Sequence, residues 1–379
     1  MLALYLLAGL AWLPTAAVLA AQRPPAQQRL ARSLPVATTP NPGVTGVQVF
    51  VEPEAGESAI LAAIANARHT LAIEIYLLTD YRIIQALEEA ARRGLTVRVM
   101  LEPHPYGGGS PERTIEQLRS AGVLARYTNP AFPLTHAKLM IVDDQRAYIM
   151  TGNFSRAALG GNRSGANREY GIIDPRPEDV SSLRALFEAD WQRATTGPLL
   201  NNAHLVISPG NARTVLQGLI SEAQHTLLIE EEEMKDHQIE AALIAAQRRG
   251  VRVQVILPLP RQGEDPNADG VAALLQGGVA VREDGQLYMH AKMLVVDGQE
   301  AFIGSENCSP PGLDSNREVG ILVADTKVLT TLQATFETDW EASQTVAQAI
   351  ETDRPANQTG NPLVRTGSLP VGLGIGEMR

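Results

Sequence analysis

The chain has 379 residues, of which 42 are acidic and 32 are basic, so its formal net charge is −10. Apolar residues make up 44% and charged residues 20%, a balance typical of a folded globular body and unlike that of a disordered or fibrous chain. The single cysteine excludes an intramolecular disulfide and a cysteine-based zinc finger. The acidic balance argues against a broad nucleic-acid binder, which needs lysine and arginine against phosphate.

The first segment of the chain differs from the rest. Met1 to Gln22 carries no charged side chain and is mostly leucine and alanine, and about 21 such residues at ~1.5 Å each span a bilayer core as a helix. We expect residues 1–21 to be a signal peptide or a membrane anchor, so that the protein is exported (periplasmic or secreted) or held at the membrane. Three arginines follow this segment, and an uncleaved anchor with that bias would instead keep the body cytoplasmic.

Two further segments are expected to lie outside the folded body. Residues 22–44 are rich in proline, glutamine and threonine, and residues 351–379 combine glycine, proline and asparagine with little apolar periodicity. Both compositions are typical of disorder, so we predict a linker and a tail.

Between these segments the sequence repeats itself. Five blocks occur in the same order in both halves: Ala67–Leu71 with Ala223–Leu227, Ala90–Pro103 with Ala245–Pro258, Thr135–Asp144 with Met289–Gly298, Asn167–Glu169 with Asn316–Glu318, and Phe187–Trp191 with Phe336–Trp340. The copies lie about 150 residues apart, which is too long for a solenoid repeat and typical of a domain. The sequence therefore predicts two fused copies of one domain, residues 45–198 and 199–350.

Within the first copy, strands and helices are predicted to alternate. In chain order they are a strand over 71–77, a helix over 81–93 capped by Asp80 and ended by Gly94, a strand over 96–101, a helix over 111–121 capped by Ser110, a hairpin over 138–142 and 147–151, a strand over 168–173 and a helix over 179–192. The second copy repeats this order, with Asp236 capping and Gly250 ending the equivalent of the first helix. Such alternation predicts an α/β fold in which helices cover both faces of each sheet.

The sharpest chemical signal is the pattern His-x-Lys-x-x-x-x-Asp, which occurs twice. Its members are His136, Lys138 and Asp143 in the first copy and His290, Lys292 and Asp297 in the second. Residues i and i+2 of a strand share a face, so each histidine and its lysine point the same way. A neutral imidazole beside an ammonium suits attack on a phosphate, because the ammonium binds phosphoryl oxygens and favours the unprotonated ring. The odd offset takes each aspartate to the strand end, in what we predict to be a hairpin turn, so the aspartates are expected to be mainly structural despite belonging to the motif.

Polar residues follow each hairpin. Asn153 in the first copy, and Ser305 and Asn307 in the second, can donate hydrogen bonds to phosphate oxygens. Glu169 and Glu318 come next, and a carboxylate on the far nitrogen of each motif histidine would fix its tautomer and raise its basicity.

An acidic run, Glu230–Glu233, lies beside the expected site. We interpret it as a solvated strand end or cap, with a substrate or metal role as the alternative. No other compact group of metal ligands is apparent in the sequence, so neither a metal nor a cofactor is predicted.

These residues resemble the phospholipase D superfamily, also called the HKD family. The match lies in HAKLMIVDD with the later Asn153, and in HAKMLVVDG with GSEN. The second copy fits the family pattern His-x-Lys-x4-Asp-x6-Gly-Ser-x-Asn at every position, whereas the first has Met150 and Thr151 where Gly and Ser are usual. The resemblance covers residues 45–345.

The resemblance implies that the two halves pack with pseudo-twofold symmetry around one shared active site. In two-motif members the N-terminal histidine is usually the nucleophile, so His136 would form a phosphohistidine while His290 acts as general acid and base. The residues that would hold the phosphate are Lys138, Lys292, Asn153 and Asn307. No metal or cofactor is required in the family's common mechanism.

Three functions stay open at this point. The first is phospholipid chemistry, either hydrolysis by a phospholipase D or transfer by a cardiolipin-synthase-like enzyme. A typical bacterial cardiolipin synthase carries two N-terminal spans and one is present here, which favours hydrolysis over transfer. The second is an endonuclease, which the acidic body disfavours, and the third is a non-catalytic envelope or binding protein, which two intact motifs disfavour. We expect a phospholipid substrate at a membrane surface, no nucleic acid, and a monomer.

Overall fold

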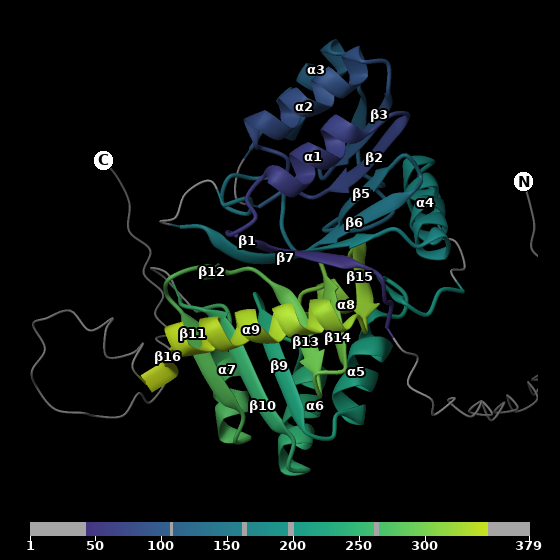
Figure 1. Ribbon diagram of the computed structural model, residues 1–379. Helices are drawn as coiled ribbons and strands as arrows, with labels where there is room; N and C mark the ends of the chain where they lie inside the picture. Colours follow the sequence, from purple (N-terminus) through teal and green to yellow (C-terminus); the bar gives the residue numbers. More distant parts are fainter. Residues whose placement is uncertain (1–42, 107–108, 161–164, 196–200, 261–264, 348–379) are drawn as a thin grey trace, which may run out of the picture. The chain divides into compact units, whose positions relative to one another are not determined.

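The computed structural model describes residues 43–106, 109–160, 165–195, 201–260 and 265–347 (Figure 1). All of them belong to one compact unit, residues 41–379. The predicted leader and tail, and all but the end of the predicted linker, lie outside the described residues. Among the helices that are described, none is both long and apolar enough to cross a bilayer.

The first half is built on a mixed sheet with the strand order β1-β7-β6-β5-β2-β3-β4. Its strands are β1 (Gln48–Glu52), β2 (Thr70–Ile75), β3 (Thr96–Leu101), β4 (Leu124–Tyr127), β5 (Lys138–Val142), β6 (Arg146–Met150) and β7 (Asn167–Asp174). Its helices are α1 (Ser58–Asn66), α2 (Tyr81–Arg92), α3 (Pro111–Ser120) and α4 (Pro177–Trp191). The first three helices pack on one face of this sheet and α4 packs on the other.

The second half has the same strand order, β8-β15-β14-β13-β9-β10-β11, with one added strand, β16, beside β11. Its strands are β8 (Leu205–Ser208), β9 (Thr226–Glu231), β10 (Arg252–Pro258), β11 (Ala280–Asp284), β13 (Lys292–Val296), β14 (Glu300–Gly304), β15 (Glu318–Val323) and β16 (Gln344–Thr345). Its helices are α5 (Ala212–Glu222), α6 (His237–Arg248), α7 (Ala268–Gln276), α8 (Pro310–Asp314) and α9 (Thr326–Ala342). The short β12 (Tyr288–Met289) pairs with β7 of the first half. The predicted α/β class, two sheets each flanked by helices, is confirmed.

Local signals explain where several elements begin and end. The carboxylates of Asp80 and Asp236 each accept two main-chain hydrogen bonds at the start of α2 and α6, as predicted. Gly94 has a φ of 93°, a left-handed conformation that ends α2 at low cost because glycine has no Cβ. Ser110 differs from the prediction, because its side chain makes no capping hydrogen bond at the start of α3.

The end of the predicted linker is part of the fold. Val44 is 1% exposed and forms a parallel bridge with Val323 of β15. Its main-chain N–H donates to the carbonyl of Leu322, and its carbonyl accepts from Ala324. The prediction of disorder up to residue 44 is wrong at this point, because Val44 is apolar and packs in the core that the two halves share.

The apolar core has three parts. One lies between the first sheet and α1–α3, and a second lies between the second sheet and α5–α7. The third contains residues from the inner faces of both sheets together with α4 and α9, so the two halves share it. Phe187 of α4 and Phe336 of α9 are both buried there, each stacked on the tryptophan four residues later, at 5.9 and 5.8 Å between ring centroids. Shared burial brings the two sheets together around the site described below.

Candidate active site

Each motif histidine is hydrogen-bonded through its main chain to the other half of the protein. The N–H of His136 donates to the carbonyl of Arg317 at 2.9 Å, and that of His290 donates to the carbonyl of Arg168 at 3.4 Å. The residues just before the two histidines form short bridges with the same two arginine positions. The main chain therefore holds both histidines at the junction of the two halves.

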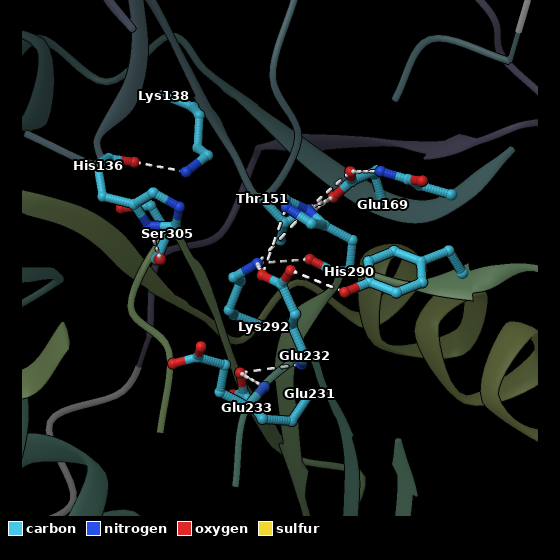
Figure 2. Close-up of polar contacts among 12 residues, drawn as sticks. His136, Lys138, Thr151, Glu169, Glu231, Glu232, Glu233, His290, Lys292 and Ser305 are labelled. Carbon is cyan, nitrogen blue, oxygen red and sulfur yellow. Dashed lines mark hydrogen bonds and ion pairs between the residues drawn. The ribbon is translucent and has the colours of Figure 1, made fainter. Parts of the chain in front are cut away.

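The imidazole of each histidine is oriented by a carboxylate from the opposite half, and Figure 2 shows this contact for His290 and Glu169. His136 Nδ1 lies 3.0 Å from Glu318 Oε2 and 3.1 Å from the carbonyl oxygen of Ser305. His290 Nδ1 lies 2.8 and 2.9 Å from the two carboxylate oxygens of Glu169. An ionised carboxylate only accepts hydrogen bonds, so each Nδ1 carries a proton and each Nε2 is left for chemistry.

The two orienting carboxylates are themselves held in place. Thr151 Oγ1 donates to Glu169 at 2.7 Å and Asn167 Nδ2 donates to the other oxygen at 2.9 Å. In the second half Asn316 Nδ2 donates to Glu318 at 3.4 Å. Thr151 departs from the family pattern, yet its Oγ1 accepts from the main-chain N–H of Tyr170 at 2.9 Å, as the equivalent Ser305 Oγ accepts from Val319.

Both motif lysines are fully buried beside their histidines. Each Nζ donates to the carbonyl oxygen of its own motif histidine, at 2.6 Å for Lys138 and 2.7 Å for Lys292. Lys138 also lies over the ring of Tyr76, which packs edge-on against the imidazole of His136 with 4.8 Å between ring centroids. Lys292 instead forms an ion pair with Glu232 at 2.7 Å. The two ammonium groups thus have different neighbours.

These neighbours give the two halves of the site different proton affinities. Burial lowers the pKa of His136, and the charge of Lys138 adds to this effect. Burial also lowers the pKa of Lys138 to about 7, although Glu318 opposes the shift. Lys292 is equally buried, yet the carboxylates of Glu232 and Glu169 raise its pKa above the ordinary value. Lys292 is therefore charged throughout the neutral range, while Lys138 titrates within it.

We expect substrate binding to weaken as the pH rises through the pKa of Lys138. A protonated lysine is needed to bind a phosphodiester anion, and the protonated fraction in the free enzyme falls above about pH 7. KM for a soluble phosphodiester should therefore increase between pH 6 and pH 9. Lys138→Arg, whose guanidinium stays charged, should flatten this increase if it retains activity. A wild-type KM that does not change over this range would contradict the prediction.

The two motif aspartates do not lie at the site. Each accepts three main-chain hydrogen bonds at 2.7–2.9 Å, Asp143 from Arg68, His69 and Thr70, and Asp297 from Gln224, His225 and Thr226. Both occupy left-handed hairpin turns, with φ of 53° and 51°, at the end of β5 or β13 that is remote from the motif histidine. Although they belong to the catalytic motif, the two aspartates are structural, as expected from their position, because their carboxylates fix the turn against β2 or β9.

The three predicted phosphate ligands have different surroundings. Ser305 Oγ accepts from the main-chain N–H of Val319 at 3.0 Å, so this hydroxyl fixes the chain that carries Glu318. Asn153 is 7% exposed, and among the described residues the amide oxygens of Asn153 and Asn307 have no hydrogen-bond partner. Isolated bridges tie the residue after each asparagine to the chain just past β2 and β9. Both amides are thus near the sheet ends that carry the histidines, and their contact with phosphate remains a proposal.

The acidic run is not the solvated strand end that the sequence suggested. Glu230 and Glu231 are buried, and burial raises the pKa of Glu231 to about 8. Glu232 lies in the site, whereas Glu233 forms an ion pair with a lysine at the surface. In the part of the chain that the structure describes, no three histidine, cysteine or acidic side chains gather as metal ligands. The sequence analysis did not single out Glu232 as a site residue. When the two halves are aligned, Glu232 occupies the position equivalent to Tyr76.

A comparison with protein families matches this architecture. The family described as "Cardiolipin synthase, PLD-like domain" matches residues 60–191 and 216–340, one segment in each half. The chain belongs to this family. It is therefore a member of the phospholipase D superfamily, as the motifs indicated.

Relatives of this phospholipase D-like protein are named as cardiolipin synthases. The chain is 24% identical to cardiolipin synthase of Oceanobacillus iheyensis, over 82% of this chain and 71% of the relative. It is 26% identical to cardiolipin synthase B of Escherichia coli K12, over 74% of this chain and 76% of the relative. Among solved structures, phosphatidylserine synthase of Haemophilus influenzae shares the fold, with a TM-score of 0.61 and 14% identity over 82% of this chain and 90% of that one.

Proposed function

We propose that the protein transfers a phosphatidyl group from a phospholipid to an alcohol, in the manner of a cardiolipin synthase. The observation that carries this proposal is the pair of buried imidazoles, each held at Nδ1 by a carboxylate of the opposite half, beside two buried lysines. This arrangement leaves two Nε2 atoms for chemistry. One can attack phosphorus, and the other can protonate the leaving alcohol.

His136 is the proposed nucleophile. Because burial lowers its pKa, the ring is neutral at neutral pH and its Nε2 lone pair is available. Glu318 stabilises the positive charge that develops on the ring as the N–P bond forms. Lys138 and Lys292 neutralise the phosphoryl oxygens, with Asn153 and Asn307 as proposed donors.

The two steps of the proposed reaction balance as follows. In the first, Nε2 of His136 bonds to phosphorus, the bond from phosphorus to the leaving alcohol breaks, and that alcohol takes a proton from His290. In the second, an acceptor alcohol gives its proton to His290 while its oxygen displaces His136 from phosphorus. Splitting one displacement into two lowers each barrier, and configuration at phosphorus is retained because two inversions cancel.

The relatives are named as cardiolipin synthases, so they favour transfer over hydrolysis. The single N-terminal apolar segment had suggested the opposite preference. Cardiolipin carries two phosphatidyl groups on one glycerol, so its formation from phospholipids is phosphatidyl transfer to a primary hydroxyl. Water can compete for the same phosphohistidine, and phosphatidic acid is then the side product. We propose that this reaction takes place at a membrane surface, where the substrates lie.

The test is a product assay on phosphatidylglycerol vesicles, run beside single-stranded DNA as an alternative substrate. We expect cardiolipin, and on addition of a primary alcohol we expect a phosphatidyl-alcohol at the expense of phosphatidic acid. Acid quenching of a labelled substrate should place the label on His136. A label on His290 would exchange the two roles, inversion at phosphorus would exclude the covalent route, and cleavage of DNA alone would reject the lipid function.

Activity on a soluble phosphodiester should survive chelation. Within the described residues no cluster of metal ligands accompanies the two motifs, and the lysines supply the positive charge that a phosphoryl group requires. The measurement is the initial rate with and without EDTA on a soluble diester, which avoids effects of calcium on lipid packing. Loss of activity that a defined divalent ion restores would contradict the proposed metal-free route.

A further inference from the structure

The site differs between its two halves at one equivalent position. Tyr76 and Glu232 each follow the residue that pairs with the motif lysine in the sheet. Tyr76 places an aromatic ring against His136, whereas Glu232 places a carboxylate against the second histidine–lysine pair. The same backbone position therefore holds a neutral aromatic ring in the first half and a negatively charged carboxylate in the second half.

The carboxylate of Glu232 is fixed at both oxygens (Figure 2). Its Oε2 lies 2.7 Å from Lys292 Nζ and 3.4 Å from His290 Nε2. Its Oε1 accepts from the hydroxyl of Tyr288 at 3.3 Å. Since Glu169 occupies Nδ1 of the same imidazole, His290 has a carboxylate at each ring nitrogen. Within the described part of the chain, His136 has a carboxylate at Nδ1 alone and an aromatic ring beside it.

We propose that Glu232 is a positioning residue that keeps a proton on His290, so that His290 is the general acid of the first step and His136 is left as the nucleophile. This inference rests on the two-step reaction proposed above. The doubled motif alone does not say which histidine is the nucleophile and which is the general acid. Glu232 is the residue that distinguishes them.

The local charge balance supports this assignment. His290 faces the carboxylates of Glu169 from β7 and Glu232 from the end of β9, the ammonium of Lys292 from β13 and the phenol of Tyr288 from β12. The two carboxylates and the one ammonium group sum to one negative charge. A protonated imidazole would bring this sum to zero. Among the described residues, the carboxylate within hydrogen-bond distance of His136 is that of Glu318, and burial, together with the charges of Lys138 and Lys292, lowers the pKa of His136. The imidazole of His290 therefore lies between two carboxylates and one ammonium group, an arrangement that favours a cationic ring.

The effect of the charges on Glu232 itself is consistent with this balance. Burial opposes its ionisation, yet His290 and Lys292, with a smaller effect from His136, hold the pKa of Glu232 below its usual range. Electrostatic coupling is reciprocal, so the interaction that keeps the carboxylate ionised also stabilises the positive charges beside it. Burial raises the pKa of Glu231, the preceding residue in the chain, to about 8.

The decisive experiment varies the leaving group in Glu232→Gln, which keeps the shape of the side chain and removes its charge. The substrates are soluble methyl aryl phosphodiesters whose leaving phenols range from phenol to 4-nitrophenol. A poor leaving group needs the proton of His290, whereas nitrophenolate leaves without one. We therefore expect the variant to lose roughly 10- to 100-fold in kcat on the phenyl ester, part of the usual general-acid contribution, and little on the nitrophenyl ester. The alkaline limb of the kcat profile on the phenyl ester should move to lower pH.

Two further variants complete the test. Glu232→Tyr copies the residue of the first half and should show the same leaving-group dependence as Glu232→Gln. Glu233→Gln, in the same acidic run but paired with Lys235 at the surface, should match the wild type on every ester. An equal loss on all esters, or an unmoved alkaline limb, would reduce Glu232 to a structural role and overturn the inference. Since the esters are soluble diesters, this outcome is distinct from a failure of phosphatidyl transfer, which the vesicle assay reports.

Discussion

His136→Ala and His290→Ala should each abolish turnover while leaving the protein folded. Both imidazoles belong to one site, since the carboxylate that orients each comes from the opposite half. Loss of a residue from a catalytic group that acts as a unit costs on the order of 10⁴- to 10⁶-fold in kcat. The measurement is kcat on a soluble phosphodiester, with circular dichroism and an unfolding curve to show that each variant keeps its fold.

A surface histidine provides the matched control for these variants. His237 lies at the start of α6 with its side chain 87% exposed, and its imidazole pairs with Glu240 at 3.0 Å. His237→Ala should keep wild-type activity. If the two motifs served separate sites, each motif variant would instead retain about half the activity, and native-like proteins with half-activity would refute the shared site.

Arg168→Met should cost about 3–5 kcal/mol of unfolding free energy, the second large effect that we expect. Arg168 of the first half donates to both oxygens of Asp339 of the second half, at 2.5 and 2.8 Å, and both side chains are about 95% buried. Removing the guanidinium leaves the carboxylate of Asp339 buried without its charge partner. Equilibrium denaturation by urea measures the loss.

Two comparisons separate the charge effect from a loss of packing. Arg168→Met combined with Asp339→Leu removes both charges and should recover much of the lost stability, because no unpaired charge then stays buried. Arg92→Met removes an arginine whose side chain is 58% exposed and pairs with Glu89 at the surface, and it should cost no more than about 1 kcal/mol. A cost at Arg168 as small as that at Arg92 would contradict the role of the buried pair.

The parts of the fold that depend on local signals could be predicted from the sequence. The strand over 96–101 has the bounds of β3, and Asp80 caps α2 where an N-cap aspartate was expected. Asp143 and Asp297 lie in tight turns because short hairpins between apolar strands require left-handed residues. Strand β1 pairs with β7, which lies more than 100 residues further along the chain. Alternation of apolar and polar residues can indicate a strand, but it does not reveal which strand is its partner.

The reactive side chains of the candidate site could be predicted from the sequence. Which carboxylate pairs with which histidine could not. His136 and His290 stood out by their doubled motif, and Glu169 and Glu318 by their repeated position. The sequence did not show that each carboxylate orients the histidine of the other half, because equivalent residues in a duplicated chain can pair within a half or across halves. The structure shows the same crossing in the buried ion pairs of Arg168 with Asp339 and of Arg317 with Asp190.

Glu232 was misjudged for a physical reason. A run of four glutamates is most often hydrated, because burying a carboxylate is costly unless a cation or a donor compensates. Here Lys292 and His290 supply that compensation, and they lie about 60 residues further along the chain. Partners at such separations become visible only once the sheet brings β9 beside β13.

The presence of both halves in one polypeptide has a consequence for how the site can evolve. In a symmetric homodimer every position occurs twice with the same side chain, so a tyrosine and a glutamate cannot occupy its two equivalent places. A single chain with two halves is free of this restriction, and Tyr76 and Glu232 show that the two copies have diverged at that place. A symmetric site accepts a diester in either of two opposite orientations. With the roles proposed for the two histidines, the diverged site would take the diester in one orientation, with the leaving alcohol toward His290.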